Sequence, residues 1–124
     1  MLVYDTSVSE QIIGCAIAVH RTLGPGLLES TYEAALCIEL SDAGLLYRQQ
    51  LGVPLTYKGR LIGEHRPDLV VANSVVVEIK SVERLVEIHV AQLMTYLRVT
   101  NLNVGLLLNF NSVVMRNGIR RVVL

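Results

Sequence analysis

Apolar residues recur at helical spacing in the first third of the chain. The first such stretch covers about residues 7–23, with a polar start at Thr6 or Ser7, and the Gly-Pro-Gly turn at 24–26 ends it. A second stretch with the same spacing covers residues 27–43 and stops at a glycine. Because each stretch has one apolar face and only a short turn separates them, we expect two helices packed as a hairpin.

The middle of the chain alternates short apolar runs with turn residues, a pattern that predicts strands. Residues 46–53 and 55–57 look extended. A tight turn at 58–60 leads into a longer extended segment at 61–72, and another follows at 75–80. We expect these segments to form a three-stranded meander.

The last third of the chain returns to helical spacing before it ends in strands. Residues 83–99 predict a third helix, and the apolar run 104–110 is short enough to be a buried strand. An Asn-Gly pair within residues 116–118 predicts a closing hairpin. The resulting order, α-α-β-β-β-α-β-β, is typical of an α/β fold with a mixed central sheet flanked by helices. No repeat or linker divides it, so we expect a single domain over residues 1–124.

Composition limits the choice of partner. The chain has 124 residues with eleven basic and eleven acidic side chains, so no overall positive field favours a polyanion. Charge is nevertheless uneven, because residues 1–42 hold six acids while the segment after Glu87 holds four arginines and no acid. This asymmetry could turn one side toward a phosphate backbone, or it could reflect ordinary solvated faces. The hydrophobic content of 52% is high for this length and suggests a covered apolar surface, for example in a homodimer.

Cysteine usage and hydropathy indicate the compartment. Cys15 and Cys37 lack the close spacing of a zinc site or a disulfide framework, so we expect buried free thiols in a reducing environment. Asp5 and Glu10 interrupt any signal-peptide pattern, and no apolar run approaches the length of a bilayer span. We therefore expect a soluble, cytoplasmic protein with no membrane partner.

Three charges, Asp68, Glu78 and Lys80, stand inside apolar strand segments. A desolvated carboxylate is costly unless it is paired or bound to a cation, so charges in such segments need a reason. Side chains alternate along a strand, and Glu78 and Lys80 therefore share a face. An odd connection such as residues 72–74, in which Asn73 tolerates a left-handed backbone, places Asp68 opposite Glu78. A two-residue turn would put it on the other face.

Two carboxylates and an ammonium group in one place can support hydrolysis of a phosphate ester. The carboxylates can hold Mg²⁺, which polarises a phosphate oxygen, while the site places or deprotonates a water for in-line attack. The alternative is a surface cluster of Asp, Glu and Lys without function. The apolar residues that flank the three charges favour the site.

The same residues resemble a known family. Pro67-Asp68, nine intervening residues and then Glu78-Ile79-Lys80 are similar to the signature of the PD-(D/E)XK nuclease superfamily, whose members share a restriction-endonuclease-like core. The segment GLLESTY at 26–32 resembles the name-giving motif of the small GxxExxY proteins within that superfamily. Further similar segments lie at residues 57–59, 68–71, 92–97, 105–110 and 118–121.

This resemblance implies roles for individual residues. Asp68, Glu78 and the main-chain carbonyl of Ile79 would bind Mg²⁺ or Mn²⁺, and Lys80 would position the attacking water. Glu29 is either a helical acid that completes the metal site or an ordinary acid in the first turn of a helix.

Five further residues are candidates for substrate contact. Gln92 and Tyr96 lie four apart and so share a helix face, similar to the Gln-x-x-x-Tyr helix of some superfamily exonucleases, where the pair contacts DNA or supports the site. In the alternative, the tyrosine packs on the sheet with its hydroxyl bonded to the glutamine. Three arginines on the last hairpin could contact a phosphate backbone weakly: Arg116, Arg120 and Arg121.

Two functions remain open. The first is a metal-dependent nuclease that hydrolyses phosphodiester bonds, in DNA more than in RNA, and the intact set of two acids and a lysine favours it. The second is a non-catalytic nuclease-fold module that binds nucleic acid or assembles with proteins, which the zero net charge and small size favour. Glu33, one turn after Glu29, is expected to face solvent.

Overall fold

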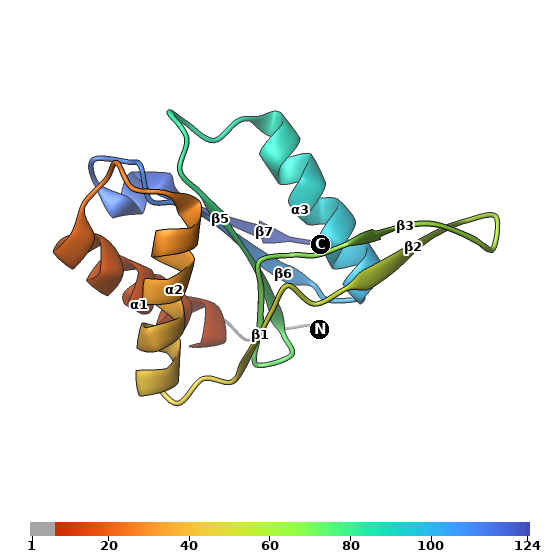
Figure 1. The fold of residues 1–124 in the computed structure, drawn as a ribbon, viewed down its shortest axis with the longest axis horizontal. Helices are drawn as coiled ribbons and strands as arrows, with labels where there is room; N and C mark the ends of the chain where they lie inside the picture. Colours follow the sequence, from red (N-terminus) through yellow and green to blue (C-terminus); the bar gives the residue numbers. More distant parts are fainter. Residues whose placement is uncertain (1–6) are drawn as a thin grey trace.

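The computed structural model describes residues 7–124, in which three helices flank a central sheet (Figure 1). Helix α1 (Ser7–Leu23) and helix α2 (Glu29–Asp42) cover one face of the sheet, and helix α3 (Glu87–Thr100) covers the other. The buried side chains of α1 recur every three or four residues, as an amphipathic helix requires. The predicted helical hairpin is confirmed, whereas a start at Thr6 lies outside the described residues.

Five strands form the central sheet in the order β1-β4-β5-β6-β7. β5 (Val75–Lys80) and β6 (Val104–Asn109) run parallel, and the other neighbouring pairs are antiparallel. The remaining strands are β1 (Tyr47–Gln49), β4 (Leu69–Val71) and β7 (Ile119–Val123). Because helices cover both faces, the central strands are continuous apolar runs. The predicted α/β fold with a mixed central sheet is confirmed.

Alternation along the strands separates two hydrophobic clusters. Val77 and Ile79, at odd positions of β5, pack in the cluster that includes α1 and α2. Val70 and Val76, at even positions of β4 and β5, pack with α3. Even positions therefore point to the α3 face, and they include the three charges that the sequence singled out.

Two predictions from composition can be checked within the described residues. Cys15 and Cys37 are buried free thiols, as expected. Between residues 7 and 124, no helix combines the length and the apolar character needed to cross a bilayer.

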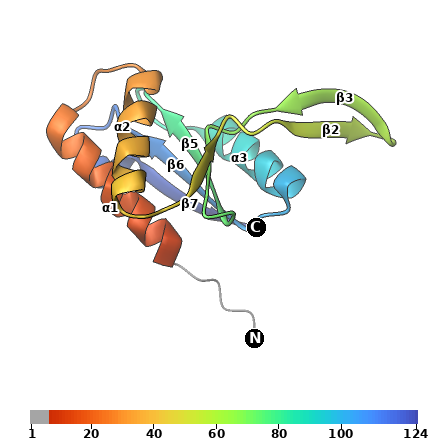
Figure 2. The same ribbon diagram turned by 60° about the horizontal axis from the view of Figure 1, so that its bottom comes forward.

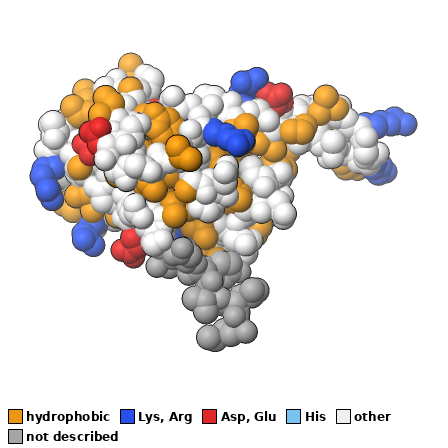
Figure 3. Space-filling model, turned by 90° about the horizontal axis from the view of Figure 1, so that it is seen from below, with side chains coloured by type: hydrophobic (Ala, Val, Ile, Leu, Met, Phe, Trp, Pro, Cys, Tyr) orange, Lys and Arg blue, Asp and Glu red, His pale blue; other side chains and the backbone are white. Residues whose placement is uncertain are grey.

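β2 (Val53–Tyr57) and β3 (Arg60–His65) form a separate two-stranded sheet that projects from the body and is here called the arm (Figures 1 and 2). The base of the arm packs on α3, where the ring of His65 meets the ring of Tyr96 edge to face. Figure 3 shows Lys and Arg side chains gathered at the tip of the arm and apolar side chains along it.

The predicted three-stranded meander is wrong. Five strands lie between α2 and α3, and they belong to two different sheets. The expected segment 46–53 breaks at Gln50, whose φ of 52° leaves the extended region. The expected segment 61–72 breaks near Pro67, which has no N–H to donate to a strand ladder. As a result β1 pairs with β4, and the chain between them leaves the sheet as the arm.

The predicted hairpin turn at Asn117-Gly118 is also wrong. A 3₁₀ helix, Met115–Gly118, connects β6 to β7, and neither residue of the pair has a positive φ. Packing requires the glycine instead, because a Cβ on Gly118 would collide with the carbonyl oxygen of Asn109. Helix α3 likewise begins at Glu87 rather than at residue 83, since hydrogen bonds between Asn109 and the main chain of Val82 hold residues 81–86 as a loop.

Tyr32 locks the turn between α1 and α2. Its ring is fully buried and stacks on Phe110 at the end of β6, with centroids 4.6 Å apart. Its hydroxyl donates to the carbonyl of Gly24 at 2.6 Å and accepts from the amide of Leu27 at 3.1 Å. Gly26 has a φ of 100°, which side chains rarely allow. The first and last residues of the GLLESTY segment thus shape the turn that places Glu29.

Removing the Tyr32 hydroxyl should destabilise the fold. Tyr32→Phe leaves the Gly24 carbonyl and the Leu27 amide without this partner, so we expect the free energy of unfolding to fall by about 1–3 kcal/mol in urea titrations. Tyr57→Phe is the matched control, because Tyr57 lies in the arm and is 62% exposed. Equal losses in the two variants would contradict this role for Tyr32.

Candidate functional site

The connection between β4 and β5 sets the position of the candidate site. Its three residues, 72–74, make it the odd connection that was predicted. Asn73 has the expected left-handed backbone, with φ of 52°, and Ala72 shares it. The observed strand register, continued by one residue, places Asp68 opposite Glu78 on the α3 face.

Asp68 and Glu78, here called the acid pair, are joined through main-chain hydrogen bonds. The amide of Ile79 donates to Asp68 Oδ2 at 2.8 Å, and the amide of Asp68 donates to Glu78 Oε1 at 3.3 Å. The side chain of Gln50 donates to Asp68 Oδ1 at 3.3 Å. These bonds hold both carboxylates at the point where β4 begins.

The acid pair has too little positive charge nearby to balance two ionised carboxylates. Glu78 is only 6% exposed. Burial and then the charge of Asp68 raise the pKa of Glu78 to about 8, and the Lys80 ammonium offsets only part of this. Within residues 7–124 neither carboxylate has an ion-pair partner within 4.0 Å. A buried carboxyl in this state either keeps a proton or needs a cation.

Lys80 ends β5 on the same face as Glu78 and is half-buried. Its carbonyl accepts a hydrogen bond from the amide of Phe110 at 3.0 Å. Its neighbour in β6 is Asn109, whose side chain accepts from the amide of Val82 and donates to the carbonyl of the same residue. Asn109 therefore fixes the chain that follows Lys80. Sequence reasoning missed it, although an amide closing a buried apolar strand is a readable signal.

Glu29 reaches the same end of β5 but does not join the acid pair. It is exposed, and its Oε1 accepts from the amide of Ser81 at 3.3 Å. The Ser81 hydroxyl in turn donates to the carbonyl of Leu27 at 2.7 Å. In the described part of the chain, no three His, Cys, Asp or Glu side chains lie close enough together to share one metal ion.

Glu33 was expected to face solvent, and this prediction is wrong. It is half-buried, and its Oε2 accepts from Gln49 Nε2 at 3.0 Å. Its pKa is raised by burial and by the charges of Asp68 and Glu29. The cause is tertiary, because Gln49 at the end of β1 and the next residue, Gln50, hydrogen-bond to the Glu33 carboxylate. The four-residue spacing from Glu29, which puts both acids on one helix face, was the available signal.

Tyr96 packs against the hydrophobic cluster on the α3 face of the sheet, whereas Gln92 is exposed. The pKa of Tyr96 is raised by burial and then by the charges of Glu78 and Asp68, so its hydroxyl lies within electrostatic reach of the two carboxylates. Its ring meets that of His65 edge to face at 5.3 Å. Within the described residues no hydrogen bond joins Tyr96 to Gln92, so the alternative in which the two bond each other is not observed.

The three predicted arginines do not form one cluster. Arg116 lies in the 3₁₀ helix, and strand alternation puts Arg120 and Arg121 on opposite faces of β7. Arg120 is aligned through Leu107 with Glu78 and so shares the α3 face. It also lines a cavity of about 450 Å³.

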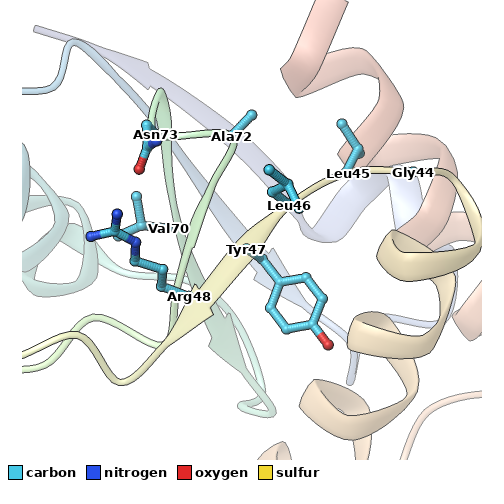
Figure 4. Close-up of a pocket in the computed structure, with 8 residues that line it drawn as sticks. All are labelled: Gly44, Leu45, Leu46, Tyr47, Arg48, Val70, Ala72 and Asn73. Carbon is cyan, nitrogen blue, oxygen red and sulfur yellow. The ribbon is translucent and has the colours of Figure 1, made fainter.

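A second cavity, of about 390 Å³, lies beside β4, and neither Asp68 nor Glu78 lines it (Figure 4). Gly44 to Arg48 and the β4–β5 turn line it. In Figure 4 the side chains of Arg48 and Val70 lie on one side of β1 while Tyr47 points to the other, toward α2. The chemistry of the acid pair is therefore separate from this cavity.

The pKa of Glu78 predicts how stability depends on pH. Between about pH 4.5 and about pH 8 the folded chain keeps a proton on Glu78 that the unfolded chain has released. Stability without metal should therefore fall as pH rises through this window, by at most about 1.4 kcal/mol per pH unit from this group. Glu78→Gln should flatten the decline in urea titrations with a chelator present, and Glu83→Gln, an exposed control, should not. An unchanged slope in Glu78→Gln would show that Glu78 titrates normally.

Comparison with known proteins agrees with this geometry. A family model described as the PD-(D/E)XK nuclease superfamily matches residues 6–122. No curated protein and no solved structure matches the chain. Membership suggests nuclease-type activity and implies a nucleic-acid substrate, and these nucleases generally use divalent metals such as Mg²⁺. The mixed sheet between helices is consistent with a restriction-endonuclease-like fold. The chain therefore belongs to the PD-(D/E)XK nuclease superfamily.

Proposed function

We propose that this chain is a nuclease that hydrolyses phosphodiester bonds, in DNA ahead of RNA, with Mg²⁺ or Mn²⁺ as its cofactor. The observation that carries the proposal is the acid pair, in which Glu78 is buried and Asp68 half-buried, with Lys80 beside it on the same strand face. A fold that only needed a stable sheet would gain nothing from a desolvated carboxyl at this position.

The acid pair fits a magnesium ion. Mg²⁺ is usually held by one or two carboxylates with several waters and substrate phosphates, so a third acid is not required. Asp68 and Glu78 would be the side-chain ligands, and the carbonyl of Ile79 would be the main-chain ligand. When bound, the ion polarises a phosphate oxygen and offsets the charge that develops on it.

The remaining chemistry belongs to the chain's own side chains. The Lys80 ammonium would hold the attacking water by its oxygen and offset negative charge on the phosphoryl group. The water oxygen forms a bond to phosphorus and gives up a proton to the solvent, the bond to the leaving oxygen breaks, and that oxygen takes up a proton from the solvent. Tyr96, which packs on the same face of the sheet as the acid pair, would contact the substrate. Gln92 on the same helix and Arg120 on the same sheet face would extend the contact, with Arg116 and Arg121 further away.

Two acids of α2 are assigned different roles in this proposal. The pKa of Glu33 is raised in part by the charge of Asp68, and this carboxyl would contact the metal ion through a water molecule. Glu29 would assist catalysis from its position next to Lys80, where its carboxylate accepts a hydrogen bond from the Ser81 amide. We also propose that the chain belongs to the GxxExxY subgroup, forms a homodimer and is cytoplasmic.

One observation favours the alternative of a non-catalytic module. Oxygens of both carboxylates accept main-chain amides, so the acid pair also closes the β4–β5 ladder. In that case the pair would be structural, and the chain would bind nucleic acid or a protein partner without cleaving it. Metal binding and cleavage distinguish the two functions.

Metal binding should stabilise the protein through the acid pair. In thermal unfolding, Mg²⁺ at 100 times its Kd should add about 2.7 kcal/mol. The effect should be larger near pH 8 than near pH 6, because the metal displaces the proton of Glu78. Asp68→Asn and Glu78→Gln should lose it, and Asp42→Asn, an exposed acid at the end of α2, should keep it. Stabilisation that survives in both site variants would place the metal elsewhere.

Cleavage should depend on the same residues. With Mg²⁺ or Mn²⁺ the purified protein should nick or degrade DNA, and Asp68→Ala or Lys80→Ala should lower the rate by about 10²-fold or more without unfolding the chain. Unchanged cleavage in these variants would reveal a contaminating nuclease. No cleavage by a wild type that binds Mg²⁺ would favour the binding module.

The two helical acids can be ranked by matched variants. Because the charge of Asp68 helps to raise the pKa of Glu33 while the carboxylate of Glu29 is bonded to the Ser81 amide, Glu33→Gln should weaken Mg²⁺ binding more than Glu29→Gln, with a several-fold higher Kd in isothermal calorimetry. If Glu29→Gln weakened Mg²⁺ binding more than Glu33→Gln, Glu29 and not Glu33 would be the helical acid of the metal site.

A further inference from the structure

The cavity of about 450 Å³ that Arg120 lines is found at the end of the sheet where β5 and β6 finish. Its walls come from the loop that follows β5 and from the segment that connects β6 to β7. It is here called the arginine cavity, because Arg84 and Arg120 both line it. Its volume is within the range of about 300–1,000 Å³ that is usual for small-ligand sites. Ligands of open α/β sheets bind outside the carboxyl ends of parallel strands, and β5 and β6 are such a pair.

Strand register places the arginine cavity beside the candidate site. Arg120 on β7 is aligned through Leu107 with Glu78. Neighbouring strands lie about 4.8 Å apart, so about 10 Å separates the backbones of Arg120 and Glu78. Asn109, which also lines the cavity, is the neighbour of Lys80 in the pairing of β5 with β6. At about 3.4 Å per nucleotide, a nucleic-acid strand bound at the acid pair would reach the cavity within about three nucleotides.

The charge of the arginine cavity favours an anion. Arg84 and Arg120 are exposed, and among residues 7–124 neither has an ion-pair partner within 4.0 Å. Glu83 is the one acid among the described residues that line the cavity, so two arginines against one glutamate leave a net charge of +1. Guanidinium groups donate paired hydrogen bonds to phosphate oxygens. Both arginines are thus available to a phosphate group.

Other parts of the cavity wall are apolar and uncovered. Val113 is 86% exposed and Val114 is 53% exposed, and both line the cavity. Leu85 and Ile119 line it as well and are half-buried. Cations and exposed aliphatic side chains in one cavity suit a ligand that has a phosphate group and an apolar ring face, as a nucleotide has. An acidic peptide could combine the same features, but the position next to the acid pair favours the nucleotide.

We propose that the arginine cavity binds one unpaired nucleotide of the substrate strand, within about three nucleotides of the bond that is cut. Arg84 and Arg120 hold its phosphate group, and Val113 packs on its base. A paired base is stacked inside the duplex and enters such a cavity only if it is extruded, which costs free energy. The substrate is therefore a single strand or a strand with an unpaired segment. The inference rests on the proposed nuclease function for its choice of ligand, but binding in the cavity needs no metal.

Binding of a mononucleotide without metal tests the cavity by itself. When dAMP is titrated in the presence of a chelator, it should shift the amide NMR signals of residues 83–85 and 112–120. Arg84→Ala and Arg120→Ala should each raise the Kd of dAMP about tenfold, because each removes a charged hydrogen-bond donor. Arg98→Ala is the matched control and should leave the Kd unchanged, since Arg98 is an exposed arginine in the last turn of α3.

Inorganic phosphate tests whether the base contributes to binding. It should bind more weakly than dAMP, because it lacks the contact with the apolar wall. Val113→Ser should weaken dAMP several-fold and leave the Kd of inorganic phosphate unchanged.

A cleavage assay with Mg²⁺ connects the cavity to the substrate. A single-stranded oligonucleotide should be cut faster than the same sequence in a fully paired duplex, and Arg120→Ala should raise its KM with little change in kcat. If the wild type binds dAMP in the cavity but cuts neither substrate, the nuclease function fails and the nucleotide site stands.

Four results would overturn the nucleotide site. The first is a titration in which dAMP shifts no signal around the cavity, and the second is an equal loss of dAMP affinity in Arg98→Ala and Arg120→Ala. The third is inorganic phosphate that binds as tightly as dAMP, since the cavity would then take an anion without a base. The fourth is an acidic peptide that gives the same shifts at a lower concentration than dAMP, which would assign the cavity to a protein partner. Faster cleavage of the paired duplex would contradict the unpaired substrate.

Discussion

The register between β4 and β5 is the constraint on which the candidate site depends. The turn at 72–74, with left-handed backbone at Ala72 and Asn73, aligns the two strands so that Asp68 stands opposite Glu78. A shift by one residue would send Asp68 to the face covered by α1 and α2. The same alignment buries Glu78 beside a second carboxylate, which raises its pKa and leaves the pair in need of a proton or a cation.

A second set of contacts holds the end of β5, where Lys80 lies. Tyr32 closes the turn before α2 and stacks on Phe110, whose amide binds the Lys80 carbonyl. Ser81 is bonded both to Glu29 and to the carbonyl of Leu27. Turn, helix and strand are thus connected by hydrogen bonds around the lysine. In this protein the stability of the fold and the placement of charge at the site rest on the same groups.

The sequence predicts the features that depend on local periodicity or on strand alternation. These include the helical hairpin, the buried strands, the odd connection and the meeting of Asp68 with Glu78. It fails where distant segments decide the outcome. The positive φ of Gln50 and the exit of the arm depend on β1 pairing with a strand formed later in the chain. Gly118 is explained by a carbonyl on β6 and not by a turn, and Glu33 is half-buried and bonded to a glutamine from β1.

The most direct measurement is a carboxyl ¹³C NMR titration of Glu78, with and without Mg²⁺. The account predicts a midpoint near pH 8 in the metal-free protein and a move to lower pH when Mg²⁺ is added. A midpoint near the ordinary value of 4.5 that Mg²⁺ leaves unchanged would contradict it, because Glu78 would then be neither desolvated nor a metal ligand.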